Sequence, residues 1–197
     1  MRKALALVMG LSLMLFVTAC GDGGKAAADA AIKAAETAFA AVTAEAAQYV
    51  PDQQKVVADA IAAVKDAFAK GNFQQALTDA NALTAKIDAL KAAADAKKAE
   101  VTRSWEALST GLPQVVTAIT ERMDILGKAK KLPATVSKEA YDGAKAGLDT
   151  VNQTWAAAQD AFKAGNLMDA VAKAGTVKTE AAKIMTALGM ELPPALQ

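Results

Sequence analysis

The sequence predicts an all-α fold, a bundle of about six helices, and three observations lead to it. Alanine, the residue with the highest helix propensity, fills about a quarter of the 197 residues. Proline, which interrupts helices, occurs only five times. Between the prolines, apolar residues recur at alternating steps of three and four, which is the spacing of one face of an α-helix.

The first two helices are predicted on either side of Pro51. Residues 25–50 carry one apolar stripe, which predicts a first helix. Pro51 suits the first turn of the second helix, because the N–H that proline lacks would have no intrahelical partner there. Gly71 suits a left-handed cap at the end of that helix, since glycine adopts a positive φ without steric cost.

The next two helices are predicted to meet at Gly111–Pro113. Asn72 is suited to cap the third helix, and no glycine or proline interrupts residues 73–110. We therefore expect one long helix there, with a break at the polar pair Lys97–Lys98 as the alternative. Gly111 and Pro113 are expected to interrupt the helix, so residues 112–131 are expected to form a separate fourth helix.

The last two helices are predicted to follow Ser137 and Asn166, both of which are suited to cap a helix. The fifth helix carries a regular apolar stripe and ends at Gly165. Gly143 and Gly147 lie one turn apart in it. Because glycine is unfavourable in a helix interior, this pair predicts either close packing against a neighbouring helix or a local bend.

The chain also contains an internal repeat. Residues 66–77 match residues 160–171 at an offset of 94, with a phenylalanine, the pair Gly-Asn and a following alanine in common. This match predicts a duplicated three-helix unit with halves of about 25–110 and 111–190, unless alanine-rich helices simply resemble one another by composition. The segment Gly-Asn-Phe-x-x-Ala-Leu also resembles the turn and second helix of a tetratricopeptide repeat, which implies helical hairpins.

A targeting signal precedes the helices. Arg2 and Lys3 stand before the apolar run Ala4–Val17, which is too short for an ordinary membrane span of about 20 residues. This layout is typical of a secretory signal. The alternatives are a cleaved signal followed by a chance cysteine, or an uncleaved short anchor. Cys20 is the only cysteine of the chain, and an unmodified single thiol would be a liability in an oxidising compartment.

The tetrapeptide Val17-Thr18-Ala19-Cys20 resembles the lipobox of bacterial lipoproteins, in which an aliphatic and two small residues precede an invariant cysteine. The resemblance implies a signal peptide over residues 1–19 that is cleaved after Ala19. It implies that Cys20 then carries a thioether-linked diacylglycerol and an acyl chain on its amino group. Residues 20–24 are the expected tether, and residues 25–197 the expected helical domain.

The residue after the cysteine bears on localisation. In Gram-negative lipoproteins, an aspartate directly after the cysteine tends to hold the protein in the inner membrane. Here Gly21 follows Cys20, and Asp22 comes only second. The resemblance therefore implies the outer membrane, facing the periplasm, rather than the inner membrane.

The composition argues against several classes of function. Removal of residues 1–19 leaves 20 basic and 21 acidic residues, a net charge of −1, which disfavours nucleic acid as a partner. Histidine is absent, and no Ser-x-x-Lys replaces it, so we expect neither an enzyme nor a cofactor or metal site. Tyr141 and Trp155 lie on apolar stripes and are expected in the core. They would line a pocket if the bundle were hollow.

The sequence thus predicts a lipid-anchored, periplasm-facing helical protein that acts as an interaction or scaffold module of the cell envelope. Its expected partners are the membrane, through the lipidated Cys20, and another envelope protein. One alternative is a carrier of a small apolar ligand held between helices. Another is a structural spacer of the envelope, against which the prolines and the repeat argue.

Overall fold

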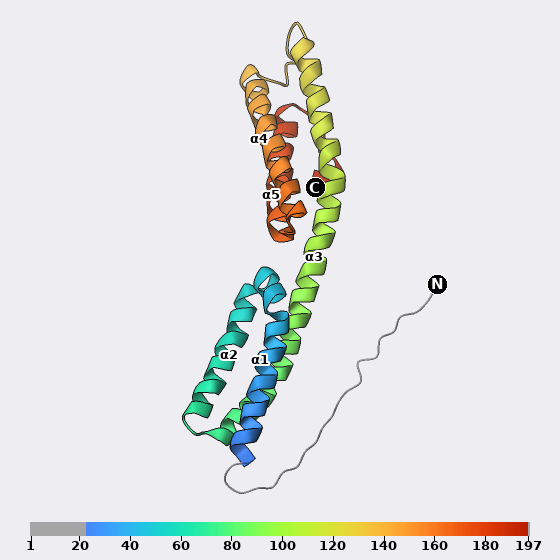
Figure 1. The fold of residues 1–197 in the computed structure, drawn as a ribbon. Coiled ribbons are helices and arrows are strands. Elements are labelled where there is room, and N and C mark those ends of the chain that lie inside the picture. Colours follow the sequence, from blue (N-terminus) through green and yellow to red (C-terminus); the bar gives the residue numbers. More distant parts are fainter. Residues whose placement is uncertain (1–22, 197) are drawn as a thin grey trace, which may run out of the picture. The chain divides into compact units, whose positions relative to one another are not determined.

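The structure is a computed structural model that describes residues 23–196, and within this range it is helical with no strand, which confirms the all-α prediction. Figure 1 shows the order of the elements. The α-helices are α1 (Gly23–Tyr49), α2 (Pro51–Ala69), α3 (Phe73–Lys128), α4 (Lys138–Lys163) and α5 (Leu167–Ala187). A short 3₁₀ helix, η1 (Pro194–Leu196), follows.

The predicted break at Gly111–Pro113 is wrong, because α3 runs through it as one helix of 56 residues. The described chain therefore has five α-helices where about six were expected. Leu112 and Val115 are buried on the same stripe as Trp105 and Ile119. Burial of this stripe favours helical continuity, although Pro113 cannot donate the hydrogen bond that the helix would otherwise make. The structure also excludes the alternative break at Lys97–Lys98.

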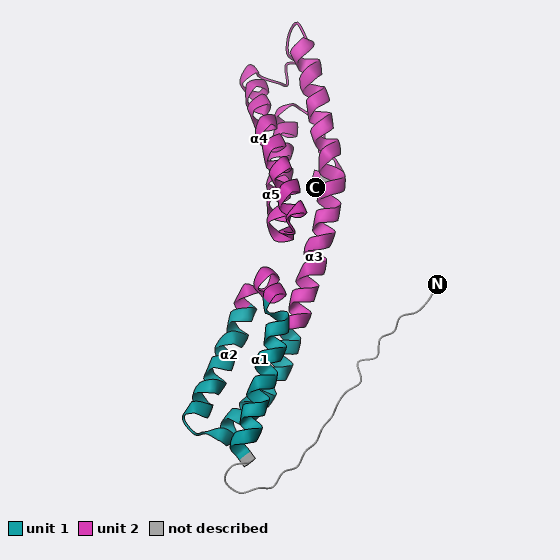
Figure 2. Ribbon diagram, viewed as in Figure 1, with its two compact units in different colours: residues 1–43, 53–89 teal, residues 44–52, 90–197 magenta. Residues whose placement is uncertain are grey.

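The chain forms two compact units, shown in Figure 2. Unit 1 comprises residues up to 43 together with residues 53–89, and unit 2 comprises residues 44–52 together with those from 90 onward. The helix α3 contributes to both units. The boundary therefore does not coincide with the predicted repeat halves, 25–110 and 111–190.

Unit 1 has a core of small and β-branched side chains drawn from α1, α2 and the first part of α3. Its buried apolar residues are Ala28, Ile32, Ala35, Val57, Ile61, Val64, Ala76, Ala80, Leu83 and Ile87. An ion pair of 2.7 Å between Lys65 of α2 and Glu36 of α1 lies at the surface of this unit. The alanines let the helices approach one another more closely than leucines would.

Unit 2 has a larger core with aromatic, leucine and methionine side chains. It is formed by α3, α4, α5 and the residues that follow α5, and it includes Trp105, Leu112, Ile119, Met123, Val151, Val177, Ile184, Met185, Leu188 and Leu196. Gly147 of α4 lies directly against α5, since a Cβ placed there would be 3.0 Å from Cδ1 of Ile184. A Cβ on Gly143 would meet nothing within 4 Å. Close packing is thus confirmed for Gly147 and wrong for Gly143.

The structure shows four of the predicted caps, at Gly71, Gly165, Ser137 and Asn166. Gly71 and Gly165 have φ values of 83° and 80°, the left-handed conformation expected of them. The Ser137 side chain accepts a hydrogen bond of 3.1 Å from the N–H of Ala140, which confirms it as the N-cap of α4. Asn166 accepts one of 3.4 Å from the N–H of Asp169 at the start of α5.

Candidate functional site

The predicted anchor residues lie outside the described part of the chain. Ala19 and Cys20 both precede Gly23, the residue at which α1 begins. The structure assigns Gly23 and Gly24, the last two residues of the predicted tether 20–24, to α1. Two residues separate Cys20 from the first helix.

The two predicted pocket residues, Tyr141 and Trp155, both lie half-buried on α4 but far apart on it. The Tyr141 hydroxyl donates a hydrogen bond of 3.5 Å to the carbonyl of Met123, and it lies next to Gly127. Trp155 stacks on Trp105 of α3. Fourteen residues of helix correspond to about 21 Å, so the structure does not bring Tyr141 and Trp155 together.

The Trp155 ring belongs to a stack of three aromatic side chains. The Trp105 ring lies 5.8 Å from that of Trp155 and 4.7 Å from that of Phe162, and it is nearly parallel to both. Trp155 and Phe162 are two turns apart on α4, so the Trp105 ring is inserted between them. The fully buried Ala158 lies between them in sequence, and its small side chain leaves room for the indole. This stack fixes α3 against α4 and leaves Phe162 partly exposed.

The structure contains an apolar groove in unit 2 that the sequence did not predict. One side is α3, which contributes Gly111, Gln114, Val115 and Ala118. The other side is Met185 of α5 and the C-terminal segment Met190–Pro194. The groove has a volume of about 650 Å³, and its lining contains one ionisable residue, Glu191. We call these residues the C-terminal groove.

The groove exists because the chain reverses direction after α5. Gly189 adopts a φ of 64°, and the N–H of Met190 donates a hydrogen bond of 2.9 Å to the carbonyl of Met185. The following segment packs on the core, and Leu196 at its end is buried. The Arg122 guanidinium of α3 donates a bond of 3.4 Å to the carbonyl of Leu188, which places a cation at the C-terminus of α5. The apolar residues after Gly189 could have indicated that the C-terminal segment packs back on the core. The prediction from sequence does not include them, because it follows the apolar stripe only to the end of the last helix.

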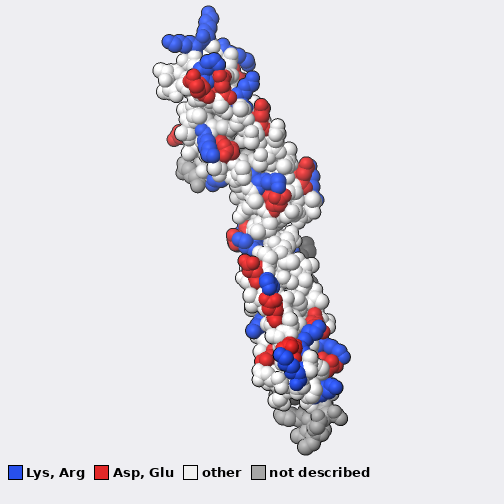
Figure 3. Space-filling model, turned by 90° about the vertical axis from the view of Figure 1, so that its left-hand side faces the viewer, with Lys and Arg blue, Asp and Glu red and all other residues white. Residues whose placement is uncertain are grey.

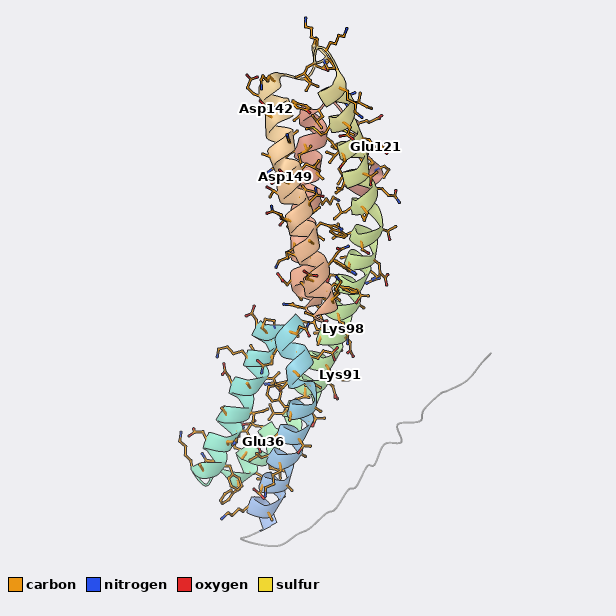
Figure 4. The ribbon with its side chains drawn as sticks, turned by 45° about the horizontal axis from the view of Figure 1, so that its top comes forward. Glu36, Lys91, Lys98, Glu121, Asp142 and Asp149 are labelled. Atoms are coloured by element: carbon orange, nitrogen blue, oxygen red, sulfur yellow. The ribbon has the colours of Figure 1, made fainter. Side chains whose placement is uncertain are left out.

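Many charged side chains of the described residues are exposed and form ion pairs, some within one helix and others between helices. Positive and negative side chains are interspersed on the face shown in Figure 3, and Lys91, Lys98 and Asp142 are labelled in Figure 4. A hydrogen bond from each lysine to a carboxylate, Asp95 for Lys91 and Glu45 for Lys98, raises the pKa of both amino groups. The Glu139 backbone N–H and then the Ser137 hydroxyl lower the pKa of the Glu139 carboxyl. These are pairs that orient surface side chains.

Buried polar groups are scarce among the residues that the structure describes. Among residues 23–196, no polar or charged residue is buried as a whole. One single atom, Nε of the half-buried Arg122, is buried without a hydrogen-bond partner. In the same range, no three histidine, cysteine or acidic side chains come together in a way that could hold a metal ion. No described helix has the length and hydropathy needed to cross a membrane.

Comparison of the chain with models of protein families, with curated proteins and with solved structures found no match.

Proposed function

We propose that this chain is a lipid-anchored, periplasm-facing helical protein that acts as an interaction or scaffold module of the bacterial cell envelope. The observation that carries the proposal is the tetrapeptide Val17-Thr18-Ala19-Cys20, which follows a basic start and a short apolar run. Acylation at Cys20 by two or more chains would give stable rather than reversible membrane attachment. Gly21 after the cysteine favours the outer membrane.

The C-terminal groove is the surface that supports an interaction role. Its lining combines two methionines, Met185 and Met190, with Leu192 and two prolines on one side and the small residues Gly111 and Ala118 on the other. Methionine side chains are flexible and polarisable, so a methionine-lined groove adapts to apolar side chains of different shapes. An amphipathic segment of another envelope protein is the occupant that we propose.

We further propose that the three-helix halves arose by duplication and that their hairpins are tetratricopeptide-like. Support comes from the two Gly-Asn turns. The N–H of Asn72 donates to the carbonyl of Ala67 at 3.0 Å, and that of Asn166 donates to the carbonyl of Ala161 at 2.9 Å. The N–H groups of Gly71 and Gly165 likewise bond the carbonyls of the phenylalanines three residues earlier.

A carrier of a small apolar ligand is the second candidate, and the dimensions of the groove favour it. Ligand sites in proteins have volumes of about 300–1,000 Å³ and are mostly apolar with a few polar groups. The C-terminal groove, at about 650 Å³ with Gln114 and Glu191 in its lining, falls within this description. Such a carrier would hold its ligand while the lipid keeps the protein at the membrane.

Photocrosslinking in intact cells separates these candidates. A photoreactive amino acid is placed at the exposed Gln114 of the groove, and a matched control is placed at Asp88, an exposed position of α3 in unit 1. A scaffold gives one discrete protein adduct from position 114 that Ala118→Lys, which fills the groove, abolishes. A carrier gives an adduct with a small apolar molecule, and Ala118→Lys abolishes this adduct as well. Equal adducts from positions 114 and 88 would contradict both roles of the groove.

A further inference from the structure

The end of unit 1 at which α1 begins has an unusual surface. The first turn of α1 lies beside the turn between α2 and α3, because Gly24, Gly71, Asn72, Phe73 and Gln74 line one shallow hollow. Figure 1 shows the start of α1 and this turn at the same end of unit 1, and Figure 2 assigns both to that unit. The half-buried Phe73 ring packs edge-on against Phe68 at 5.1 Å.

A cation covers the aromatic ring at this end. The ammonium group of Lys25 lies 5.9 Å from the centre of the Phe73 ring, which is the range of a cation–π contact. Lys25 is exposed and forms no ion pair with any residue of the described chain, whereas Lys70 nearby is paired with Asp66 at 2.6 Å. A lysine whose stem lies along apolar surface while its ammonium group stays in water is favoured at membrane interfaces.

The helix ends at this surface add positive potential. Both α1 and α3 begin here, and neither carries an acidic residue in its first turn. The other three α-helices of the described chain carry Asp52, Glu139 and Asp169 in theirs. Since helix N-termini favour anions, these two described first turns are complementary to a negatively charged surface.

The short stretch of chain between Cys20 and α1 indicates that a membrane is the surface facing this end of unit 1. Three residue steps separate Cys20 from Gly23, and a fully extended chain covers at most about 3.6 Å per residue. A lipid on Cys20 would therefore hold the start of α1 within about 11 Å of the acylated residue. No other surface of unit 1 includes the start of α1.

We propose that this end of unit 1, with Lys25 and Phe73 at its centre, rests on the anionic phospholipid headgroups of the membrane that holds the anchor. The proposal depends on the lipidation of Cys20 proposed above. The anchor then does more than retain the protein at the membrane, because the contact with headgroups also orients unit 1 with this end toward the membrane. The helix sides, with their surface ion pairs, remain available to the periplasm.

The test uses the full acylated protein in vesicles of phosphatidylethanolamine and phosphatidylglycerol, a fraction of them brominated. Acylation blocks Cys20, so a thiol introduced at the exposed Gln74 is the only one that a bimane label can modify. The control thiol is at Val56, which is 65% exposed and lies 13 residues along α2 from Ala69, about 20 Å away. The mass of each protein is measured before labelling.

Brominated lipids are expected to quench the fluorescence of bimane at position 74, and its emission maximum is expected to shift to shorter wavelength. Bimane at position 56 is expected to show neither change. Lys25→Glu should weaken the quenching at position 74 without removing the anchor. Equal quenching at both positions, or none at position 74, would overturn the proposed orientation. Labelling of the wild-type chain at Cys20 would instead show that lipidation itself fails.

Discussion

The two Gly-Asn turns have the same backbone and different surroundings. Gly71 and Gly165 adopt nearly the same φ, and the hydrogen bonds that close the two turns match in donor, acceptor and length. Around the first turn, Phe73 contacts Phe68 and Lys25. At the second, the carbonyl of Gly165 accepts a hydrogen bond of 3.2 Å from the Gln48 side chain. A short motif therefore determines how the chain turns, and the residues packed around the turn determine what it contacts.

The same contrast extends to the two units. Unit 1 fills its core with alanines and branched aliphatic residues, whereas unit 2 adds the stack of Trp105, Trp155 and Phe162 and the returning C-terminal segment. Only unit 2 contains the groove that we propose as an interaction site. The smaller side chains of unit 1 suit close helix packing, and its exposed end is where we propose contact with lipid.

Truncation of a fully buried residue gives the largest expected effect and tests whether the units respond separately. Ile119→Ala in unit 2 and Leu83→Ala in unit 1 should each cost about 2–5 kcal/mol, the range for large-to-small changes in a core. Both tryptophans belong to unit 2, so their fluorescence reports the unfolding of that unit, while circular dichroism reports all helices. We expect Ile119→Ala to shift the fluorescence transition more than Leu83→Ala does. Equal shifts would show that the units unfold as one.

Alanine at the turn glycines gives the next largest effect. A left-handed conformation costs a residue with a Cβ about 1–2 kcal/mol, and Gly71 and Gly165 have the same conformation. Neither position has an atom within 4 Å of an added Cβ, so strain of the backbone is the only cost. Urea unfolding of Gly71→Ala and Gly165→Ala should therefore show matching losses. A loss at one position alone would argue against equivalent turns.

Alanine substitution is expected to affect the two glycines of α4 differently. Gly143→Ala should raise the free energy of unfolding by up to about 1 kcal/mol, because alanine is the better helix former and the position is open. Gly147→Ala gains the same propensity but pushes its Cβ against Ile184, which must move. We expect the second variant to be less stable than the first by thermal unfolding. The double variant Gly147→Ala, Ile184→Val serves as the control, since it should recover part of the difference.

Substitution of Glu139 is expected to have the smallest effect on stability. The pH dependence of this effect follows from the pKa of the Glu139 carboxyl. Hydrogen bonds lower the pKa of this carboxyl in the folded state below its ordinary value of 4.5. The contribution of the Glu139 carboxylate to the free energy of unfolding is therefore present above that value, and it is lost as the pH falls through the lowered pKa. Glu139→Gln should slightly reduce the melting temperature at pH 7 and leave it unchanged at pH 2. A constant difference between the two proteins at every pH would contradict this assignment.

The sequence predicted the local features well, since stripes, caps and turn glycines act over a few residues. It failed at Gly111–Pro113, where local punctuation competes with the burial of Leu112 and Val115, which depends on α4 and α5. The C-terminal groove was missed for a similar reason, because the return of residues 190–196 is determined by the core on which they pack. The anchor at Cys20 stays a prediction from the sequence.

The lipid on Cys20 is tested most directly by the intact mass of the protein purified from membranes of its host. We expect a chain that begins at Cys20 and carries a diacylglycerol and an amide-linked acyl chain. The Cys20→Ser variant should lack these groups and retain residues 1–19. A mature wild-type chain with an unmodified Cys20 would contradict the account.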